Sequence, residues 1–322
     1  MTDARIGVLA GLATAGLWVV SSLSFTKSGQ ALGATRVNLL RTVAAAVVLC
    51  AIQWLALGRL LPGMSESALL WLAASGILGL TIGDQFLFTG YVMLGPRLVS
   101  VLMTLAPSMS AILAWSVFGE TMNPVGVAGM LITTGGVAWA ALARAGAESP
   151  HTPQERRMGL MFGVAAALCQ AAGMVAAKRG LDQGVEAFDA QTIRMYAGAA
   201  TVIPLALLAR TAGLTVQAQP SRRAYAILTL GVISGPLLGV YFSMLSTAKV
   251  PVGVAATLIG LVPVLILPAT RIIDGERITV RAWTGALIAV AGIAVLSMGA
   301  SEPTKKVEAP AAATPPAAEV AR

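Results

Sequence analysis

The sequence is poor in charged residues, which make up only 11% of its 322 residues. An ordinary soluble domain carries about 25% charged residues. Hydrophobic residues reach 57%, and the mean hydropathy is +0.80. So few charges could not cover the surface of a soluble protein of this size, and disorder requires low hydrophobicity. The composition therefore excludes both classes for most of the chain and indicates a multi-pass membrane protein.

Histidine and cysteine, the side chains most used in metal and redox chemistry, are also scarce. His151 is the one histidine, and Cys50 and Cys169 are the two cysteines; none has the spacing of a zinc or haem site. No phosphate-binding loop of the form G-x4-G-K-[ST] is present, so ATP hydrolysis is not encoded. Carboxylates are not paired at helical spacing either. We therefore expect no enzyme activity, no metal and no cofactor.

Long apolar runs fill most of the chain. A membrane-spanning helix needs about 20 apolar residues, whereas transmembrane strands are shorter and alternate in polarity. Such runs lie at Ile6–Thr26, Val37–Leu57, Ala68–Gly90, Leu98–Phe118, Val125–Ala143, Gly159–Ala177, Ala190–Ala209, Ala224–Ala248, Val252–Ile272 and Ala282–Met298. The sequence therefore predicts an all-α protein with ten transmembrane helices. The net charge of +8 is scattered between these runs, which indicates helix ends and loops rather than a nucleic-acid surface.

The second half of the chain resembles the first. Arg41 and Arg194 match, and each follows an amide side chain, Asn38 or Gln191, by three residues. Five predicted helices fall in each half, and an odd number means that the two copies insert with opposite orientation. Inverted repeats of this kind are typical of transporters, which bind substrate near the midplane between the halves.

Two prolines mark a further match between the halves. Pro107 and Pro263 lie inside predicted spans, which they should kink or interrupt. A Gly-Glu pair begins twelve residues after each proline, at Gly119-Glu120 and Gly275-Glu276. Glycines then recur at matching distances, and they lie at Gly129, Gly136, Gly285 and Gly292.

The repeats define the expected organisation of the chain. Residues 5–145 form the first five-helix repeat and residues 158–299 the second. Residues 146–157 are expected to be a polar linker, and residues 300–322 a disordered tail rich in alanine and proline.

The pattern Trp18…Lys27…Arg41 and the two Pro-x11-Gly-Glu motifs resemble the drug/metabolite transporter superfamily, EamA type. The resemblance covers about Arg5 to Gly299. It implies a basket of ten helices around a central cavity, lined mainly by helices one to four and six to nine. It also implies export of amino acids, other metabolites or drugs. Gln170 departs from the pattern, because the first half has Trp18 at the matching place.

Asp84 is the main ionisable residue within a predicted span. Such a residue costs at least ~2.5 kcal/mol on insertion scales and usually faces a cavity or a partner. Asp84 is therefore a candidate to bind a proton or a cationic substrate group. The alternatives are a structural ion pair with Arg41 or Arg194, or a position near the helix end in water. Its repeat equivalent lies near Val240, so any chemistry at Asp84 breaks the pseudo-symmetry.

The two arginines and five further side chains complete the candidate site. Arg41 and Arg194 are candidates for charge recognition of an anionic group, and the alternatives are snorkelling to headgroups or a structural or gating role. Candidate substrate-binding residues are Trp18, Ser21, Gln85, Gln170 and Tyr241. Trp18 and Ser21 share a helix face, which equally suits ordinary packing, and buried amides equally join helices.

These observations predict a secondary transporter of the inner membrane, surrounded by lipid, that exports small organic solutes by alternating access. Protons are the candidate coupling ion. The alternative is a membrane protein without transport activity, either receptor-like or a lipid scramblase. A scramblase would require a polar groove that opens to lipid rather than a closed central cavity.

Overall fold

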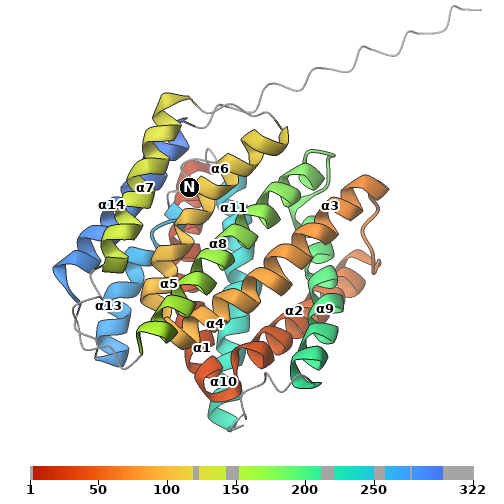
Figure 1. The fold of residues 1–322 in the computed structure, drawn as a ribbon. Helices are drawn as coiled ribbons and strands as arrows, with labels where there is room; N and C mark the ends of the chain where they lie inside the picture. Colours follow the sequence, from red (N-terminus) through yellow and green to blue (C-terminus); the bar gives the residue numbers. More distant parts are fainter. Residues whose placement is uncertain are drawn as a thin grey trace, which may run out of the picture.

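The structure, a computed structural model, describes residues 3–118, 123–142, 152–211, 221–249, 258–275 and 278–299. Within these residues every regular element is a helix, which confirms the all-α prediction (Figure 1). In the first half the elements are α1 (Asp3–Leu32), α2 (Ala34–Leu57), α3 (Glu66–Gly76), the π-helix η1 (Ile77–Gly83), α4 (Asp84–Leu94), α5 (Pro96–Met103), α6 (Leu105–Phe118) and α7 (Pro124–Leu142). In the second half they are α8 (Pro153–Leu181), α9 (Ala187–Thr211), α10 (Arg222–Val232), the π-helix η2 (Ile233–Gly239), α11 (Val240–Lys249), α13 (Val262–Asp274) and α14 (Val280–Gly299).

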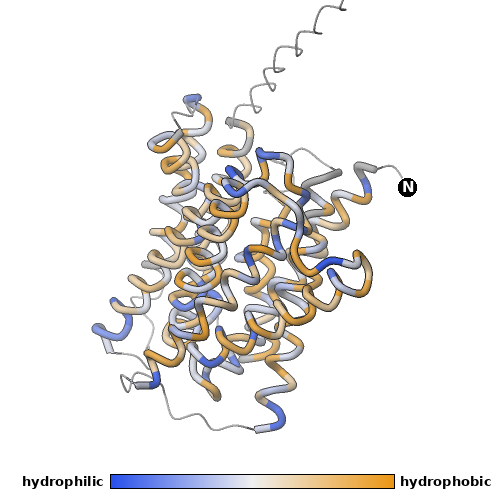
Figure 2. The backbone as a smooth tube through the Cα atoms, turned by 90° about the vertical axis from the view of Figure 1, so that its right-hand side faces the viewer, coloured by the Kyte–Doolittle hydropathy of each residue, from blue (hydrophilic) through white to orange (hydrophobic). Residues whose placement is uncertain are grey.

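The helices have the length and apolarity of membrane spans. Among the described residues, seven helical stretches qualify on length and composition, and three shorter apolar helices occupy the remaining predicted spans, namely Pro124–Ala140, Val262–Ile273 and Val280–Leu296. Figure 2 shows hydrophobic colour along most of each helix and hydrophilic colour mainly towards the helix ends. Large apolar side chains such as Leu55 and Ile272 are each 82% exposed, as suits contact with lipid. The chain is therefore a multi-pass membrane protein.

The two halves repeat the same backbone in detail. The helical stretch α3–η1–α4 recurs as α10–η2–α11 at an offset of 156 residues, and each π-helix has seven residues. Even the caps match. The hydroxyl of Ser65 accepts from the amide of Ala68, and that of Ser221 accepts from Ala224, both at 3.1 Å. The predicted two-repeat architecture is confirmed.

Equivalent helices of the two halves run in opposite directions. Gln53, near the end of α2, bonds Asp189 at the start of α9. Gly129, near the start of α7, lies against Leu296 near the end of α14. The pairs α2/α9 and α7/α14 are therefore antiparallel, as inverted repeats require.

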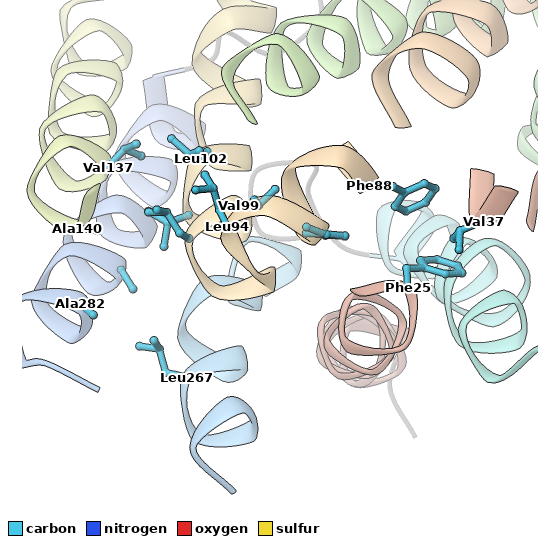
Figure 3. Packing of buried hydrophobic residues seen from close by; sticks show 14 of the residues in the cluster. Phe25, Val37, Phe88, Leu94, Val99, Leu102, Val137, Ala140, Leu267 and Ala282 are labelled. Atoms are coloured by element: carbon cyan, nitrogen blue, oxygen red, sulfur yellow. The ribbon is translucent and has the colours of Figure 1, made fainter. Parts of the chain in front are cut away.

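The halves are also interlocked at the centre of the molecule. α1 packs on α10, η2 and α11, and α8 packs on α3, η1 and α4. The first helix of each half therefore lies on the π-helical span of the other half. A hydrophobic cluster with members in both halves fills the interior, and Figure 3 shows Phe25, Val37 and Phe88 grouped on one side of it.

At the periphery, α7 and α14 lie side by side with their backbones in close approach (Figure 1). The four matching glycines all face this crossing. A Cβ on Gly129 or Gly136 would overlap the backbone of α14, and a Cβ on Gly285 or Gly292 would overlap α7. Small residues permit such packing between membrane helices, and they explain the glycine matches in the sequence.

The fourth and ninth predicted spans are broken next to their prolines. α5 ends at Met103 and α6 begins at Leu105, so Pro107 falls in the first turn of α6. α13 begins at Val262, directly before Pro263. Proline is tolerated in a first turn because its missing N–H has no helical partner there. The predicted interruption is confirmed, while Glu120 and Glu276 lie outside the described residues.

Part of the expected linker is helical. α8 begins at Pro153 because Thr152 and Glu155 form a capping box, in which each side chain bonds the backbone of the other. Residues 153–157 therefore belong to the first turns of α8. The remainder of the expected linker up to residue 151, which includes His151, and the expected tail at 300–322 lie outside the described residues.

Candidate functional site in the π-helical spans

The π-helix η1 places the candidate site at the junction of the two halves. A π-helix leaves backbone carbonyls without regular partners, and such segments occur often at functional sites. Here the amide of Asn38 on α2 donates to the Thr81 carbonyl at 3.0 Å. The Thr81 hydroxyl donates to the Gly198 carbonyl on α9 at 3.1 Å. η1 is therefore held by one helix from each half.

Asp84 follows η1 directly and is the buried anion of the site. Its side chain is only 4% exposed, and its Oδ2 forms an ion pair with Arg41 of α2, which is 8% exposed. Its Oδ1 accepts from the Gln170 amide of α8 at 3.1 Å. Asp84 thus joins a cation of its own half to an amide of the other half. Of the alternatives open in the sequence, the structure has the ion pair with Arg41.

Arg41 is enclosed by aromatic rings as well as by its ion pair. Its guanidinium carbon lies 5.1 Å from the centroid of Phe88 and 5.8 Å from that of Phe25. The two rings lie 5.0 Å apart, and Figure 3 shows them next to each other. Cation–π contacts favour the charged guanidinium where water is excluded. Arg41 is therefore buried in its own half and does not snorkel to the membrane surface.

Arg194 approaches the same cluster from α9. Its guanidinium interacts electrostatically with Asp84, and its Nη1 donates to the Gln191 amide oxygen at 3.3 Å. A Cβ on Gly79 of η1 would lie 3.7 Å from its Nη2 and 3.3 Å from the Gln170 amide oxygen. The Arg194 side chain therefore points towards η1 and the centre. Its Nε is buried and, among the described residues, has no hydrogen-bond partner.

Trp18 and Ser21 lie at the other π-helix. The glycines of η2 leave room for them: a Cβ on Gly239 would meet the indole of Trp18, and a Cβ on Gly235 would meet the Ser21 hydroxyl. Ser21 donates to the Gly231 carbonyl at 3.4 Å. Trp18 and Gln170, matched in the sequence, therefore each lie on the π-helix of the opposite half. Contact of Trp18 and Ser21 with a ligand stays a prediction.

Gln85 and Tyr241 lie apart from the charged cluster. The Gln85 amide donates to the Thr35 hydroxyl at 2.9 Å, while its amide oxygen is buried and has no partner in the described part of the chain. Tyr241 is 58% exposed, and its ring contacts that of Phe242 edge to face. The structure thus brings together Arg41, Asp84, Gln170 and Arg194, and the ligand roles of Gln85 and Tyr241 stay predictions.

A second polar cluster between the halves lies at the end of α2. Asp189, in the first turn of α9, accepts from Arg59 at 2.7 Å and from the amide of Gln53 at 2.9 Å. Gln53 is fully buried, whereas the Arg59 side chain is 41% exposed. This cluster was not predicted from the sequence. The signal was present, because a carboxylate directly before a predicted span suits the positive end of a helix dipole.

The described residues contain no group of three histidine, cysteine, aspartate or glutamate side chains that could hold a metal ion. The side chains that meet at the site offer charge pairing and hydrogen bonding by Arg, Asp and Gln.

Comparisons with known proteins agree with this architecture. The model of the EamA-like transporter family matches the chain twice, at residues 5–142 and 157–298. Among the solved structures, one crystal structure of a protein superposes with a TM-score of 0.63 at 20% sequence identity. The alignment covers 91% of this chain and 97% of the other, and it shows the fold alone. No curated protein matches the sequence significantly.

Proposed function

Because the chain belongs to the EamA-like transporter family, we propose that it is a secondary active transporter that exports small organic solutes across the inner membrane. Two inverted halves that interlock through α1 and α8 suit alternating access, in which one half rocks against the other. The substrate would bind between the halves, at the π-helical spans. Membership in a transporter family supports this role over an enzymatic one.

The contact that carries the proposal is the bridge from Asp84 to both halves. Its carboxylate holds Arg41 of the first half and Gln170 of the second. A proton on Asp84 would remove the negative charge, weaken the ion pair and loosen the contact with α8. Proton binding would therefore change how firmly the halves are joined, which is what coupling of a proton gradient to transport requires.

The test is transport in proteoliposomes that contain the purified full chain. Vesicles loaded with a defined mixture of amino acids, sugars, nucleosides and cationic drugs receive a pH gradient, and mass spectrometry measures which solutes leave. We expect gradient-dependent efflux of at least one solute class. Asp84→Asn keeps the side-chain shape and one acceptor oxygen but cannot carry the charge, so it should abolish the gradient dependence.

Asp182→Asn is the matched control, because this substitution removes the same charge far from the cluster. Asp182 is exposed and lies at the end of α8. Wild-type efflux and pH dependence in a monodisperse Asp84→Asn protein would refute the coupling role. Absence of any solute flux in the wild-type protein would refute transport itself.

The alternative, lipid scrambling, requires a polar groove open to lipid. The buried state of Arg41 and Asp84, 7% and 3% exposed, favours a solute path enclosed by protein. The same vesicles with a fluorescent phospholipid and a membrane-impermeant quencher distinguish the two functions. Without scrambling, the quencher removes only the half of the fluorescence that comes from the outer leaflet. Loss of nearly all fluorescence would support scrambling.

A further inference from the structure

The buried charges at the junction of the two halves do not balance. Arg41 and Arg194 supply two positive charges, and Asp84 supplies one negative charge. Both oxygens of Asp84 already accept hydrogen bonds, one from Arg41 and one from Gln170. In the part of the chain that the structure describes, no carboxylate lies within ion-pair distance of Arg194. One cation of the cluster is therefore left without an anion of its own.

The inverted repeat shows where the missing anion would have been. Arg41 pairs with Asp84 of its own half, and Arg194 is the repeat equivalent of Arg41. The equivalent of Asp84 in the second half, 156 residues later, is Val240. The second half thus has the arginine without the carboxylate. The backbone at Val240 follows a π-helix, as the backbone at Asp84 does.

Arg194 is aimed at the centre rather than at the membrane surface. It lies two turns inside α9, and its Nη2 points at Gly79 of η1. The one hydrogen bond that the structure gives its guanidinium is to Gln191, at 3.3 Å, and Gln191 is neutral. Arginine stays protonated in proteins, so this charge persists and favours an anion nearby.

The residues of the cluster differ in how far they are buried. Arg41 and Asp84 are buried, whereas Arg194 and Gln170 are only half-buried. A ligand that reaches the junction would therefore meet a guanidinium and an amide, while the ion pair stays covered. A planar guanidinium recognises carboxylates through two parallel hydrogen bonds.

We infer that Arg194 binds the carboxylate of the transported solute, so that the site takes small organic acids or amino acids in preference to neutral or cationic compounds. This inference rests on the proposed function, since it names the substrate class of the same site. When the solute binds, the cluster gains its second anion and becomes neutral. An anionic lipid headgroup would carry a similar charge, so the experiment tests that source separately.

The first experiment uses the wild-type full chain in a zwitterionic detergent. Thermal unfolding is measured with matched pairs that differ in charge only, namely phenylacetate with phenylacetamide, and amino acids with their amides. We expect carboxylates to raise the melting temperature and their amides to leave it unchanged. Equal shifts within each pair, or no shift with any carboxylate, would overturn the inference. So would a shift seen with phosphatidylglycerol alone.

The second experiment assigns the effect to one side chain. Arg194→Gln should weaken carboxylate binding roughly 10- to 100-fold, the range for loss of a hydrogen bond to a charged group. Arg194→Lys keeps the charge without the planar guanidinium, so its carboxylate affinity should lie between those of the wild type and Arg194→Gln. Arg36→Gln is the matched control, because Arg36 is exposed and contacts Tyr225 away from the cluster. Unchanged affinity in Arg194→Gln would overturn the assignment.

The outcomes separate this inference from the proposed function. Efflux of uncharged solutes without carboxylate binding would retain transport and reject the role of Arg194. If Arg194→Gln does not yield folded protein, the carboxylate and amide pairs on the wild-type chain still decide the question.

Discussion

The two π-helical spans have the same backbone and opposite surroundings. η1 and η2 each begin with isoleucine, have glycine at the third and seventh positions, and lie 156 residues apart. η1 is surrounded by polar groups: Asn38, Gln170 and the guanidinium of Arg194. η2 is packed against Trp18, Ser21 and Phe25 of α1. The difference shows that the duplicated backbone supplies a symmetric frame, while the charged site forms around the first half's π-helical span from side chains of both halves.

The strongest test of this difference replaces the carboxylate after η1 with the apolar residue found at the equivalent position after η2. Asp84→Val copies Val240 and leaves Arg41 buried with no anion. Removal of one partner from a buried pair costs about 3–5 kcal/mol, so the free energy of unfolding should fall by that amount. Chemical unfolding in detergent measures it.

A double variant sharpens this prediction. Arg41→Leu combined with Asp84→Val removes the whole pair and should recover most of the lost stability, because apolar replacements of buried pairs are often neutral. If Asp84→Val is as stable as the wild type, the ion pair does not stabilise the fold. The difference between the two π-helical spans would then have no effect on stability.

The second test concerns the close approach of the end of α3 to α9. A Cβ on Gly76 would overlap the Arg194 carbonyl, whereas the equivalent position in the second half holds Val232. Gly76→Val should therefore destabilise the protein by about 3 kcal/mol, the upper part of the range for overpacking. The melting temperature in detergent measures this. Val232→Ala, which only trims a side chain, should cost less, and an equal cost would contradict the asymmetry.

The third test compares the first turns of α2 and α9. Asp189→Ala would leave the fully buried amide of Gln53 with the longer of its two hydrogen bonds, 3.4 Å to the Thr192 hydroxyl, and would remove the carboxylate that pairs with Arg59. The loss should cost about 1–3 kcal/mol. Its repeat equivalent, Arg36, makes a cation–π contact with Tyr225 at 5.9 Å and is exposed. Arg36→Ala should therefore cost only about 0.5–1 kcal/mol. Thermal unfolding of both variants checks the order, and a larger effect of Arg36→Ala would reverse it.

The fourth test asks where the halves should behave alike. Ser65 and Ser221 cap equivalent helices with hydrogen bonds of the same length, 3.1 Å. Ser65→Ala and Ser221→Ala should each cost about 1 kcal/mol, the usual value for a lost N-cap. Unequal losses of stability in thermal unfolding would mean that the two halves differ in energetics although their backbones match.

The spans and the repeat were predictable because hydropathy and motif spacing are local properties of the sequence. The role of Asp84 was left open between binding a proton or a cationic substrate group, an ion pair with Arg41 or Arg194, and a position in water, because one sequence does not show which side chains face each other. The contact with Gln170 was not predicted, because it depends on how α8 lies on the span of the other half. The π-helices were also not predicted, because an α-helix and a π-helix of seven mostly apolar residues have similar hydropathy, although the repeated Ile-x-Gly-x3-Gly was present.

Packing also decided which candidate side chains meet. Trp18 and Ser21 share a helix face with Phe25, and the sequence could not distinguish a ligand from the glycines of η2 as the occupant opposite this face. Tyr241 matches Gln85 in the repeat, yet it is 58% exposed while Gln85 is half-buried. Equivalent positions diverge in burial because the surrounding side chains differ.

The glycine crossing of α7 and α14 has a consequence for biosynthesis. The two helices are synthesised 156 residues apart, so at about 5–20 residues per second α7 waits roughly 8 to 30 seconds for its partner. During that time its small-residue face has no matching surface from α14. We expect chains truncated before Val280 to be removed by membrane proteases, which pulse-chase labelling would measure. A helix of the second half, α14, thus covers the small-residue face of a helix of the first half, α7.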